Sequence, residues 1–322
     1  MQRRKFIENI IFGSTIMSVP LSITGCNYDS KKIQFGVCAD VHKDVIHDAN
    51  FRLSEFIESA KESDLDFIIQ LGDFCRPVDS NKSFIDRWKR FPGPRYHVLG
   101  NHDIDEGFTR EQTLSFWGAE KKYYSFDSGD FHFVVLDGNE KNPFEDQVQG
   151  YPRYIGKEQQ EWLRQDLLSV EKPVIVFSHQ SLDHEDGIEN RQEIRKILTN
   201  ANAEAGFTKV IACFSGHHHS DYYVKAQGIY YIQINSMSYK WVGGDYQTIR
   251  YSQEVNKKYP LIKYTIPYKE PLFAFVTIKD GKMEIRGRRT EFVGPGPDEL
   301  GIVKSVISPI VPYISDNKIL FT

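Results

Sequence analysis

The chain has 322 residues, of which 40% are hydrophobic, 26% charged and 13% aromatic. This composition is typical of a globular protein with a sizeable core, and the length fits one large domain or two smaller ones. The formal net charge is -4 and Lys and Arg form no long blocks. The charge therefore argues against a partner that is a nucleic-acid polymer, because such binding depends on many phosphate contacts.

Residues 1–26 differ from the rest of the chain. They begin with the basic run MQRRKF and continue through an apolar stretch to ITGC, which is the layout of an export signal. The stretch is too short for a membrane-spanning helix, which needs about 20 apolar residues. Arg3 and Arg4 resemble a twin-arginine signal. Residues 21–26, LSITGC, resemble a bacterial lipobox, which implies cleavage before Cys26 and a lipid on its sulfur.

A plain secretory signal with an incidental Cys, or a short N-terminal anchor, is the alternative for this segment. The lipobox interpretation predicts export from a bacterial cytoplasm. The mature protein would then be a periplasmic or cell-envelope lipoprotein that contacts the membrane through Cys26. Cys38, Cys75 and Cys213 are the other cysteines, and their spacing implies no disulfide framework.

After a linker over residues 27–32, apolar runs alternate with amphipathic runs. Strands are expected over 32–42, 65–73, 94–103, 173–180 and 208–219. Helices are expected over 49–64, 83–91, 156–170 and 190–201, and hairpins over 121–139, 222–235 and 271–288. This alternation predicts one α/β (α+β) domain over 33–291, with two mixed sheets flanked by helices. Residues 292–322 are expected to form a C-terminal tail without a core of its own.

Each expected strand outside the hairpins ends in residues of a metal-ligand type. In chain order these residues are Asp40 and His42, Asp73, Asn101 with His102 and Asp103, His179, and His217 to His219. Loops at strand ends present side chains from a rigid scaffold. In an extended segment, residues two apart point to the same side. Asp40 is therefore expected to share a side with His42, and His217 with His219, while His218 faces away.

These five motifs, in this order, resemble those of calcineurin-like metallophosphoesterases over roughly residues 33–290. The resemblance implies a β-sandwich flanked by helices, with two metal ions at the strand ends. It implies that the first ion is held by Asp40, His42, Asp73 and His219. It implies that the second ion is held by Asp73, Asn101, His179 and His217. His102 would be the catalytic residue that protonates the leaving group, steadied by Asp103.

A carboxylate that bridges the ions, from Asp73, and a bridging hydroxide would hold two dications together, and the hydroxide would attack phosphorus. Nitrogen and oxygen donors without thiolate favour Mn as the divalent metal, with Fe or Zn as alternatives. Arg76 stands where a purple acid phosphatase-like sequence has a tyrosine ligand, which argues against a tyrosine-bound iron. Cys75 lies beside the ligands and is expected to be a buried or loop thiol.

The expected function is the hydrolysis of phosphate esters or phosphoanhydrides in a small phosphorylated substrate. The alternatives are a nucleotide-diphosphate hydrolase and a cyclic nucleotide phosphodiesterase. The runs NRQEIRKIL and GIYYIQIN further resemble the Mn-dependent ADP-ribose/CDP-alcohol diphosphatase branch, which implies a nucleotide derivative as substrate. A non-catalytic metal-binding scaffold is the alternative of another class, and the intact motifs argue against it.

Two residues outside the motifs, Arg76 and Tyr239, are the expected substrate contacts. Four further residues lie within reach of the strand ends by sequence: Asp44, His47, Lys240 and Trp241. The loop over residues 138–156 is expected to form a wall or lid over the site.

Overall fold

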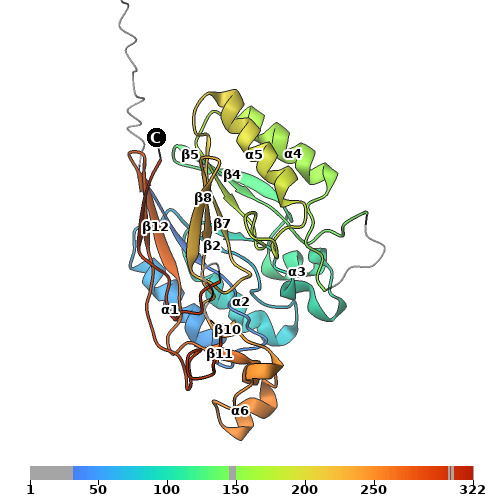
Figure 1. Ribbon diagram of the computed structural model, residues 1–322, viewed down its shortest axis with the longest axis vertical. Coiled ribbons are helices and arrows are strands. Elements are labelled where there is room, and N and C mark those ends of the chain that lie inside the picture. The colour runs from blue at the N-terminus through green and yellow to red at the C-terminus, as the bar shows by residue number, and fades with distance from the viewer. Residues whose placement is uncertain (1–31, 145–149, 304, 306–307, 322) are drawn as a thin grey trace, which may run out of the picture.

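The computed structural model describes residues 32–144, 150–303, 305 and 308–321. The expected export signal and most of the linker lie outside these residues. The described strands form two six-stranded sheets and a two-stranded ribbon (Figure 1). Both large sheets are mixed and both are flanked by helices, as the sequence predicted.

The first sheet has the strand order β14-β13-β12-β1-β2-β3. Its strands are β1 (Ile33–Cys38), β2 (Phe67–Gln70), β3 (Arg95–His97), β12 (Ala274–Lys279), β13 (Lys282–Arg286) and β14 (Asn317–Leu320). Strands β1, β2 and β3 are parallel, whereas β12 pairs antiparallel with β1, β13 with β12, and β14 with β13. The register places Phe35 opposite Phe67 on one side and Val276 on the other.

The second sheet has the strand order β4-β5-β6-β7-β9-β8. Its strands are β4 (Tyr124–Ser128), β5 (Phe131–Val135), β6 (Val174–Phe177), β7 (Val210–Ser215), β8 (Tyr222–Ala226) and β9 (Ile229–Gln233). Strands β5, β6, β7 and β9 are parallel, and β4 and β8 are antiparallel edges. The ribbon pairs β10 (Tyr239–Trp241) with β11 (Thr265–Pro267).

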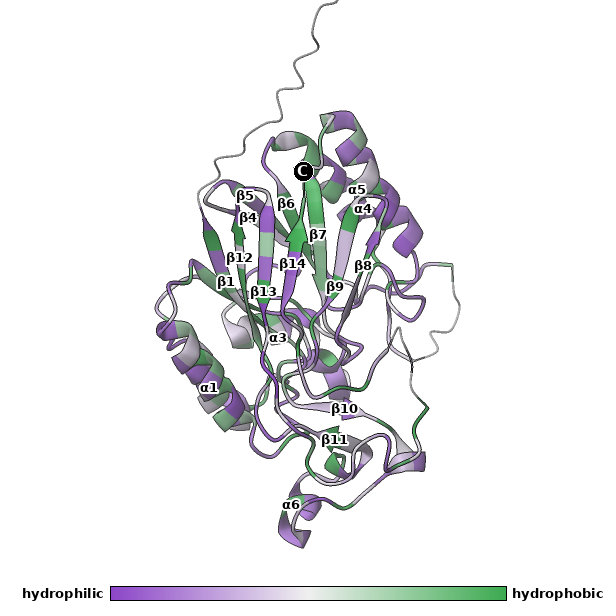
Figure 2. Ribbon diagram, turned by 60° about the vertical axis from the view of Figure 1, so that its left-hand side comes forward, coloured by the Kyte–Doolittle hydropathy of each residue, from purple (hydrophilic) through white to green (hydrophobic). Residues whose placement is uncertain are grey.

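Helices lie on the outer face of each sheet (Figures 1 and 2). The α-helices are α1 (Ala49–Lys61), α2 (Lys82–Trp88), α3 (Arg110–Trp117), α4 (Lys157–Ser169), α5 (Arg191–Ala205) and α6 (Gln253–Lys258), and the 3-10 turns are η1 (Asp79–Asn81), η2 (His102–Gly107), η3 (Gly244–Tyr246) and η4 (Ile262–Tyr264). Helices α1 and α2 pack on the first sheet. Helices α4 and α5 pack on the second.

Aromatic rings fill the space between the two sheets. Phe35 of the first sheet stacks on Phe67 at 4.9 Å and meets Phe133, Phe177 and Phe214 of the second sheet edge-on. The central strands are covered on both faces, which explains why they are continuous apolar runs rather than alternating ones. Every residue of β2, β5, β6 and β7 is buried.

Local sequence signals set the ends of several helices. Thr109 and Gln112 form a capping box at the start of α3, and Gly118 ends that helix in the left-handed region (φ 79°). Helix α5 ends in the same way at Gly206 (φ 73°). Such ends satisfy the backbone groups that a helix leaves free. Helix α3, the ribbon and α6 were not expected from the sequence.

The described part of residues 292–322, which was expected to be a tail without a core of its own, joins the core of the main domain. Strand β14 pairs with β13 as an edge of the first sheet, and Ile314 and Ile319 are buried between the sheets. The polar positions Asn317 and Lys318 hide this strand in the sequence, because an edge strand needs few apolar residues. The three expected hairpins are confirmed as β4–β5, β8–β9 and β12–β13.

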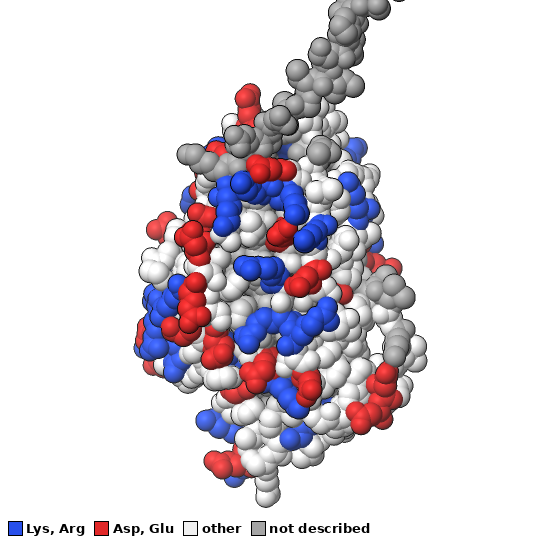
Figure 3. All heavy atoms as spheres, turned by 90° about the vertical axis from the view of Figure 1, so that its left-hand side faces the viewer, with Lys and Arg blue, Asp and Glu red and all other residues white. Residues whose placement is uncertain are grey.

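The surface in Figure 3 carries interspersed Lys, Arg, Asp and Glu side chains, with no continuous basic area on this face. None of the helices in the described ranges is both long and apolar enough to span a bilayer.

Candidate active site

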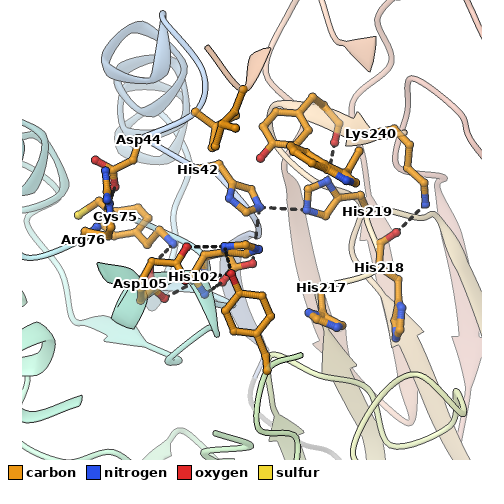
Figure 4. Close-up of a pocket in the computed structure, with 18 of the residues that line it drawn as sticks. His42, Asp44, Cys75, Arg76, His102, Asp105, His217, His218, His219 and Lys240 are labelled. Atoms are coloured by element: carbon orange, nitrogen blue, oxygen red, sulfur yellow. Dashed lines mark hydrogen bonds and ion pairs between the residues drawn. The ribbon is translucent and has the colours of Figure 1, made fainter. Parts of the chain in front are cut away.

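The loops that follow the parallel strands meet at one end of the two sheets. They line a cavity of about 710 Å³. Its walls include His42, Asp73, His102, His217 and His219 (Figure 4). Residues from both sheets therefore face the same space, as expected for the carboxyl ends of parallel strands.

One group of side chains that could hold a metal ion consists of Asp40, His42 and His219, all buried. The Nε2 atoms of His42 and His219 lie 3.1 Å apart. Oδ1 of Asp40 lies 3.3 Å from Nε2 of His219 and 3.9 Å from Nε2 of His42. Metal–ligand bonds of about 2.1 Å at right angles place neighbouring donors about 3 Å apart. The spacing of this group fits a single ion.

The second group consists of Asp73, His179 and His217. Nε2 of His179 lies 3.2 Å from Nδ1 of His217 and 3.2 Å from Oδ2 of Asp73. Oδ1 of Asn101 lies 3.2 Å from the same Nε2 atom. The structure thus brings Asn101 to this group, which also fits one ion.

Asp73 lies between the two groups. Its Oδ2 atom is 3.2 Å from His179 and 3.5 Å from Nε2 of His42. Its Oδ1 atom accepts a hydrogen bond of 2.8 Å from the backbone N–H of His102, which fixes the orientation of the carboxylate. One carboxylate is therefore placed to reach both ions.

The histidine tautomers fit metal binding. Nδ1 of His219 donates to the carbonyl of Tyr239 at 2.7 Å, and Nδ1 of His179 donates to the carbonyl of Leu71 at 2.7 Å. In the neutral ring, a proton on Nδ1 leaves a lone pair on Nε2. These lone pairs face other nitrogen and oxygen atoms that also carry lone pairs, and a cation between them would stabilise this arrangement. Nitrogen and carboxylate donors without thiolate fit two divalent metal ions, and manganese suits such a mixed set.

The electrostatics of the groups support the same interpretation. Burial lowers the pKa of His42 and of His217 well below the ordinary histidine value, which keeps both rings neutral and able to bind metal. Burial also opposes protonation of His179, but the Asp73 charge outweighs it and raises the pKa of His179 to about 9. Metal binding at His179 would therefore release a proton.

The backbone of the site is strained. Five of the residues in the two groups have a positive φ: Asp40 (52°), His42 (50°), Asp73 (51°), His217 (67°) and His219 (47°). The left-handed region is unfavourable for residues with a Cβ and is concentrated at functional sites. The expectation that these loops are extended is therefore wrong. His217 and His219 do face one cavity, but they belong to different groups because the chain turns sharply between them.

His102 stands beside the groups, with its ring 5.2 Å from that of His42. Nδ1 of His102 lies 2.7 Å from Oδ2 of Asp105 and 3.1 Å from the hydroxyl of Tyr151, which itself donates to Asp105 at 2.9 Å. Burial lowers the pKa of His102, but the charges of Asp73 and Asp105 raise it more, to about 9. Because Asp105 and Tyr151 contact Nδ1, the Nε2 atom of His102 is the ring nitrogen left to meet a ligand in the cavity.

Asp103 does not steady His102, contrary to expectation. Its two carboxylate oxygens accept backbone hydrogen bonds from Gly100 (2.8 Å), Asp73 (2.9 Å) and Phe74 (2.6 Å). Asp103 therefore holds together the loops after β2 and β3. The backbone leaves helical geometry at Asp105 and Glu106, and this kink brings Asp105 back to the His102 ring.

The expected substrate contacts both border the cavity. Arg76 forms ion pairs with Asp44, at 3.5 Å, and with Glu106. The ring of Tyr239 lies 5.0 Å from that of His42 and 5.1 Å from that of His219.

Other residues near the strand ends divide between the cavity and its surroundings. Lys240 and Trp241 also line the cavity. His47 is not among the lining residues and packs on the ring of Tyr251 at 4.4 Å. Cys75 lines the cavity as a free thiol whose pKa burial raises well above its ordinary value, so it is a poor metal ligand.

Two neighbours of His102 were missed in the sequence. Tyr151 belongs to the loop over 138–156 that was expected to form a wall, and it does line the cavity. Residues 145–149 of that loop lie outside the described residues. Asp105 could not be predicted, because the sequence does not show whether the carboxylate of Asp103 or that of Asp105 contacts the His102 ring.

A fold of two mixed sheets between helices, with two His and carboxylate groups at the strand ends, defines a class of metal-dependent phosphoester hydrolases. Residues 33–221 match the family described as "Calcineurin-like phosphoesterase". Since this match covers more than half of the chain, the protein belongs to that family.

Two curated proteins are similar in sequence, both named manganese-dependent ADP-ribose/CDP-alcohol diphosphatase. The Arabidopsis thaliana protein is 26% identical over 227 residues, which cover 55% of this chain and 72% of the relative. The protein from Oryza sativa subsp. japonica is 27% identical over 214 residues, which cover 49% of this chain and 64% of the relative. The aligned part thus falls just short of two thirds of the rice protein.

Two solved structures share the fold at low sequence identity. A dimetal phosphatase from Danio rerio has a TM-score of 0.58 at 15% identity, with 81% of this chain and 98% of that chain covered. GAP50, described as the anchor in the inner membrane complex of Plasmodium, has a TM-score of 0.54 at 13% identity, with 90% and 89% covered. The fold alone therefore does not assign an activity, and the side chains at the strand ends must do so.

Proposed function

We propose that the protein hydrolyses the phosphoanhydride of a small nucleoside diphosphate derivative, using two divalent metal ions. The observation that carries this proposal is the position of Asp73, between two groups of side chains whose nitrogen and oxygen donors converge. The names of the two curated relatives support the substrate class. Simple phosphate monoesters and diesters are the competing substrates.

The proposed first group of ligands is Asp40, His42 and His219, and the second is Asn101, His179 and His217, with Asp73 shared. When bound, the ions would supply an activated water nucleophile and stabilise charge on the attacking and leaving oxygens. The protein fixes the donors through second contacts, because the carbonyls of Leu71 and Tyr239 orient two of the histidine rings.

His102 is the proposed general acid. Asp105 and Tyr151 hold Nδ1 of the ring, so that Nε2 can donate a proton to the leaving oxygen. Asp103 is a positioning residue, since its contacts are to backbone N–H groups.

Paired substitutions test these roles. Asp73→Asn should weaken both metal groups together, and bound manganese should fall for both. His102→Ala should retain manganese and lower kcat by roughly 100-fold or more. Loss of manganese in His102→Ala would contradict the assignment of His102. A purified wild-type protein that binds less than about one manganese per chain would favour a non-catalytic scaffold.

We further propose that the chain is exported through a twin-arginine signal and anchored by a lipid on Cys26. The supporting features are the run MQRRKF and the lipobox-like LSITGC. In a bacterial host, the wild-type chain should fractionate with membranes and incorporate labelled palmitate, whereas Cys26→Ala should do neither. Replacement of Arg3 and Arg4 by lysine should retain the chain in the cytoplasm. Export of that double variant at the wild-type level would contradict the twin-arginine route.

A further inference from the structure

Strand β10 carries three side chains whose directions alternate. Tyr239 is 1% exposed and lies against the rings of His42 and His219. The next side chain, Lys240, turns away: its Nζ donates to the carbonyl of His218 at 2.7 Å (Figure 4). Residues two apart in a strand point to the same side, so Trp241 lies on the side of Tyr239. Pairing with β11 fixes this register.

Trp241 is 46% exposed although it lines the cavity. The ring of Tyr264 contacts it, with the centroids 5.8 Å apart. Leu261, which is 45% exposed, and Val45 also line the cavity. An apolar rim beside a charged inner end is typical of a site for a ligand with one anionic and one apolar part. An exposed indole in such a rim offers a stacking surface for a flat ring.

The length of β10 relates this rim to the metal groups. Tyr239 marks the inner end, with its ring 5.0 Å from that of His42. Two residues along a strand span about 7 Å, so the backbone of Trp241 lies about that far along β10 from Tyr239. A ligand with its phosphoryl group at the metal groups and a flat ring on Trp241 therefore needs a linker between the two parts. A pentose between phosphate and base supplies it.

We propose that Trp241 stacks on the base of the nucleoside diphosphate derivative. Strand β10 would then connect the part of the site that binds phosphate to the part that binds the base. This inference rests on the proposed function and adds the part of the substrate that is recognised and the residue that recognises it. Leu261 and Val45 complete the apolar rim, and Arg76 borders the same cavity with Asp44 and Glu106.

The test compares Trp241→Ala and Trp241→Phe in the full chain with manganese. The substrates are ADP-ribose and a dialkyl diphosphate that has no ring. Trp241→Ala should lower kcat/KM for ADP-ribose roughly 10- to 100-fold, the loss expected for one base stack, and leave the dialkyl compound within about twofold. Trp241→Phe should keep most of the activity on ADP-ribose. The matched control is Tyr223→Ala, an aromatic residue that is 45% exposed and not among the cavity-lining residues, and it should change neither rate.

Equal losses on both substrates, or no loss on either, would overturn the proposal. If the wild-type chain hydrolyses neither compound, the proposed function fails, and AMP binding to the manganese-loaded protein then tests the stack alone. Trp241→Ala should weaken that binding by roughly 10-fold or more. Unchanged AMP affinity would reject Trp241 as the base contact.

Discussion

Glycine and alanine substitutions at His217 and His218 measure the strain in the loop after β7. His217 has a φ of 67°. The hydrogen bond from the backbone N–H of His218 to the carbonyl of Gly216, at 2.7 Å, closes a three-residue turn about it. Turns of this kind with a positive φ are rare and strained. His218 is not among the described residues with positive φ, and both histidines are partly exposed.

The expected magnitude follows from two opposing terms. A residue with a Cβ costs about 1–2 kcal/mol in the left-handed region, whereas glycine loses about 0.4–1 kcal/mol more entropy on folding than alanine. At position 217 the first term wins, so His217→Gly should be more stable than His217→Ala by roughly 0.5–1 kcal/mol. At position 218 only the second acts, so His218→Gly should be less stable than His218→Ala by about 0.4–1 kcal/mol.

The assay is urea unfolding of the four variants in EDTA, followed by circular dichroism, so that metal binding does not enter the free energies. The difference between the two glycine–alanine pairs cancels the entropy of glycine and leaves the strain, about 1–2 kcal/mol. If alanine at 217 is as stable as glycine, the strained turn is absent and the reasoning fails.

Three further perturbations give distinct results. Lys240→Met removes the contacts of Nζ to the carbonyl of His218 and to Ser308, so manganese affinity measured by calorimetry should fall roughly 10-fold; unchanged affinity would contradict this support. His132→Gln removes a ring whose pKa burial lowers but Asp166 and Asp127 raise more. Because the folded pKa is raised, the stability lost in this variant should be larger at about pH 6 than at about pH 9; the opposite trend in melting temperature would refute it. Manganese at about 100 times its Kd should stabilise the wild type by about 2.7 kcal/mol, and Asp73→Asn should show little of this gain.

The candidate ligands were predictable because each lies within a few residues of the end of an apolar run. A buried strand such as VIVF, residues 174–177, is recognisable by its composition, and the ligand His179 follows it after one serine. Such positions need only the rule that carboxyl ends of parallel strands meet at one edge. The structure brings all seven expected metal residues to that edge.

The contacts that the sequence did not predict depend on how the backbone turns. Asp103 and Asp105 are alike in type and lie two residues apart, and only the kink in η2 decides that Asp105 reaches His102. Strand β14 was missed for another reason, because an edge strand is defined by its pairing with β13 rather than by its own pattern. The first contact depends on a local kink of the backbone and the second on pairing with a strand about 35 residues away, and residue types alone reveal neither.

The C-terminal segment also supports the site, which its sequence did not suggest. Ser308 bonds to Ser220 and to Lys240. Asp221, at the end of the loop that carries His217 and His219, accepts two hydrogen bonds from Ser315, at 3.0 Å and 2.6 Å. Residues 308–315 therefore stabilise the loop that carries His217, His218 and His219.

The most direct test of the proposed function is a comparison of initial rates with manganese for ADP-ribose, a chromogenic phosphomonoester and its bis-ester, with Asp73→Asn as the blank. We predict that the wild-type chain converts ADP-ribose to AMP and ribose 5-phosphate well above the blank, and much faster than either ester. A preference for a simple ester would contradict the nucleoside diphosphate assignment, and rates equal to the blank on all three compounds would contradict catalysis itself.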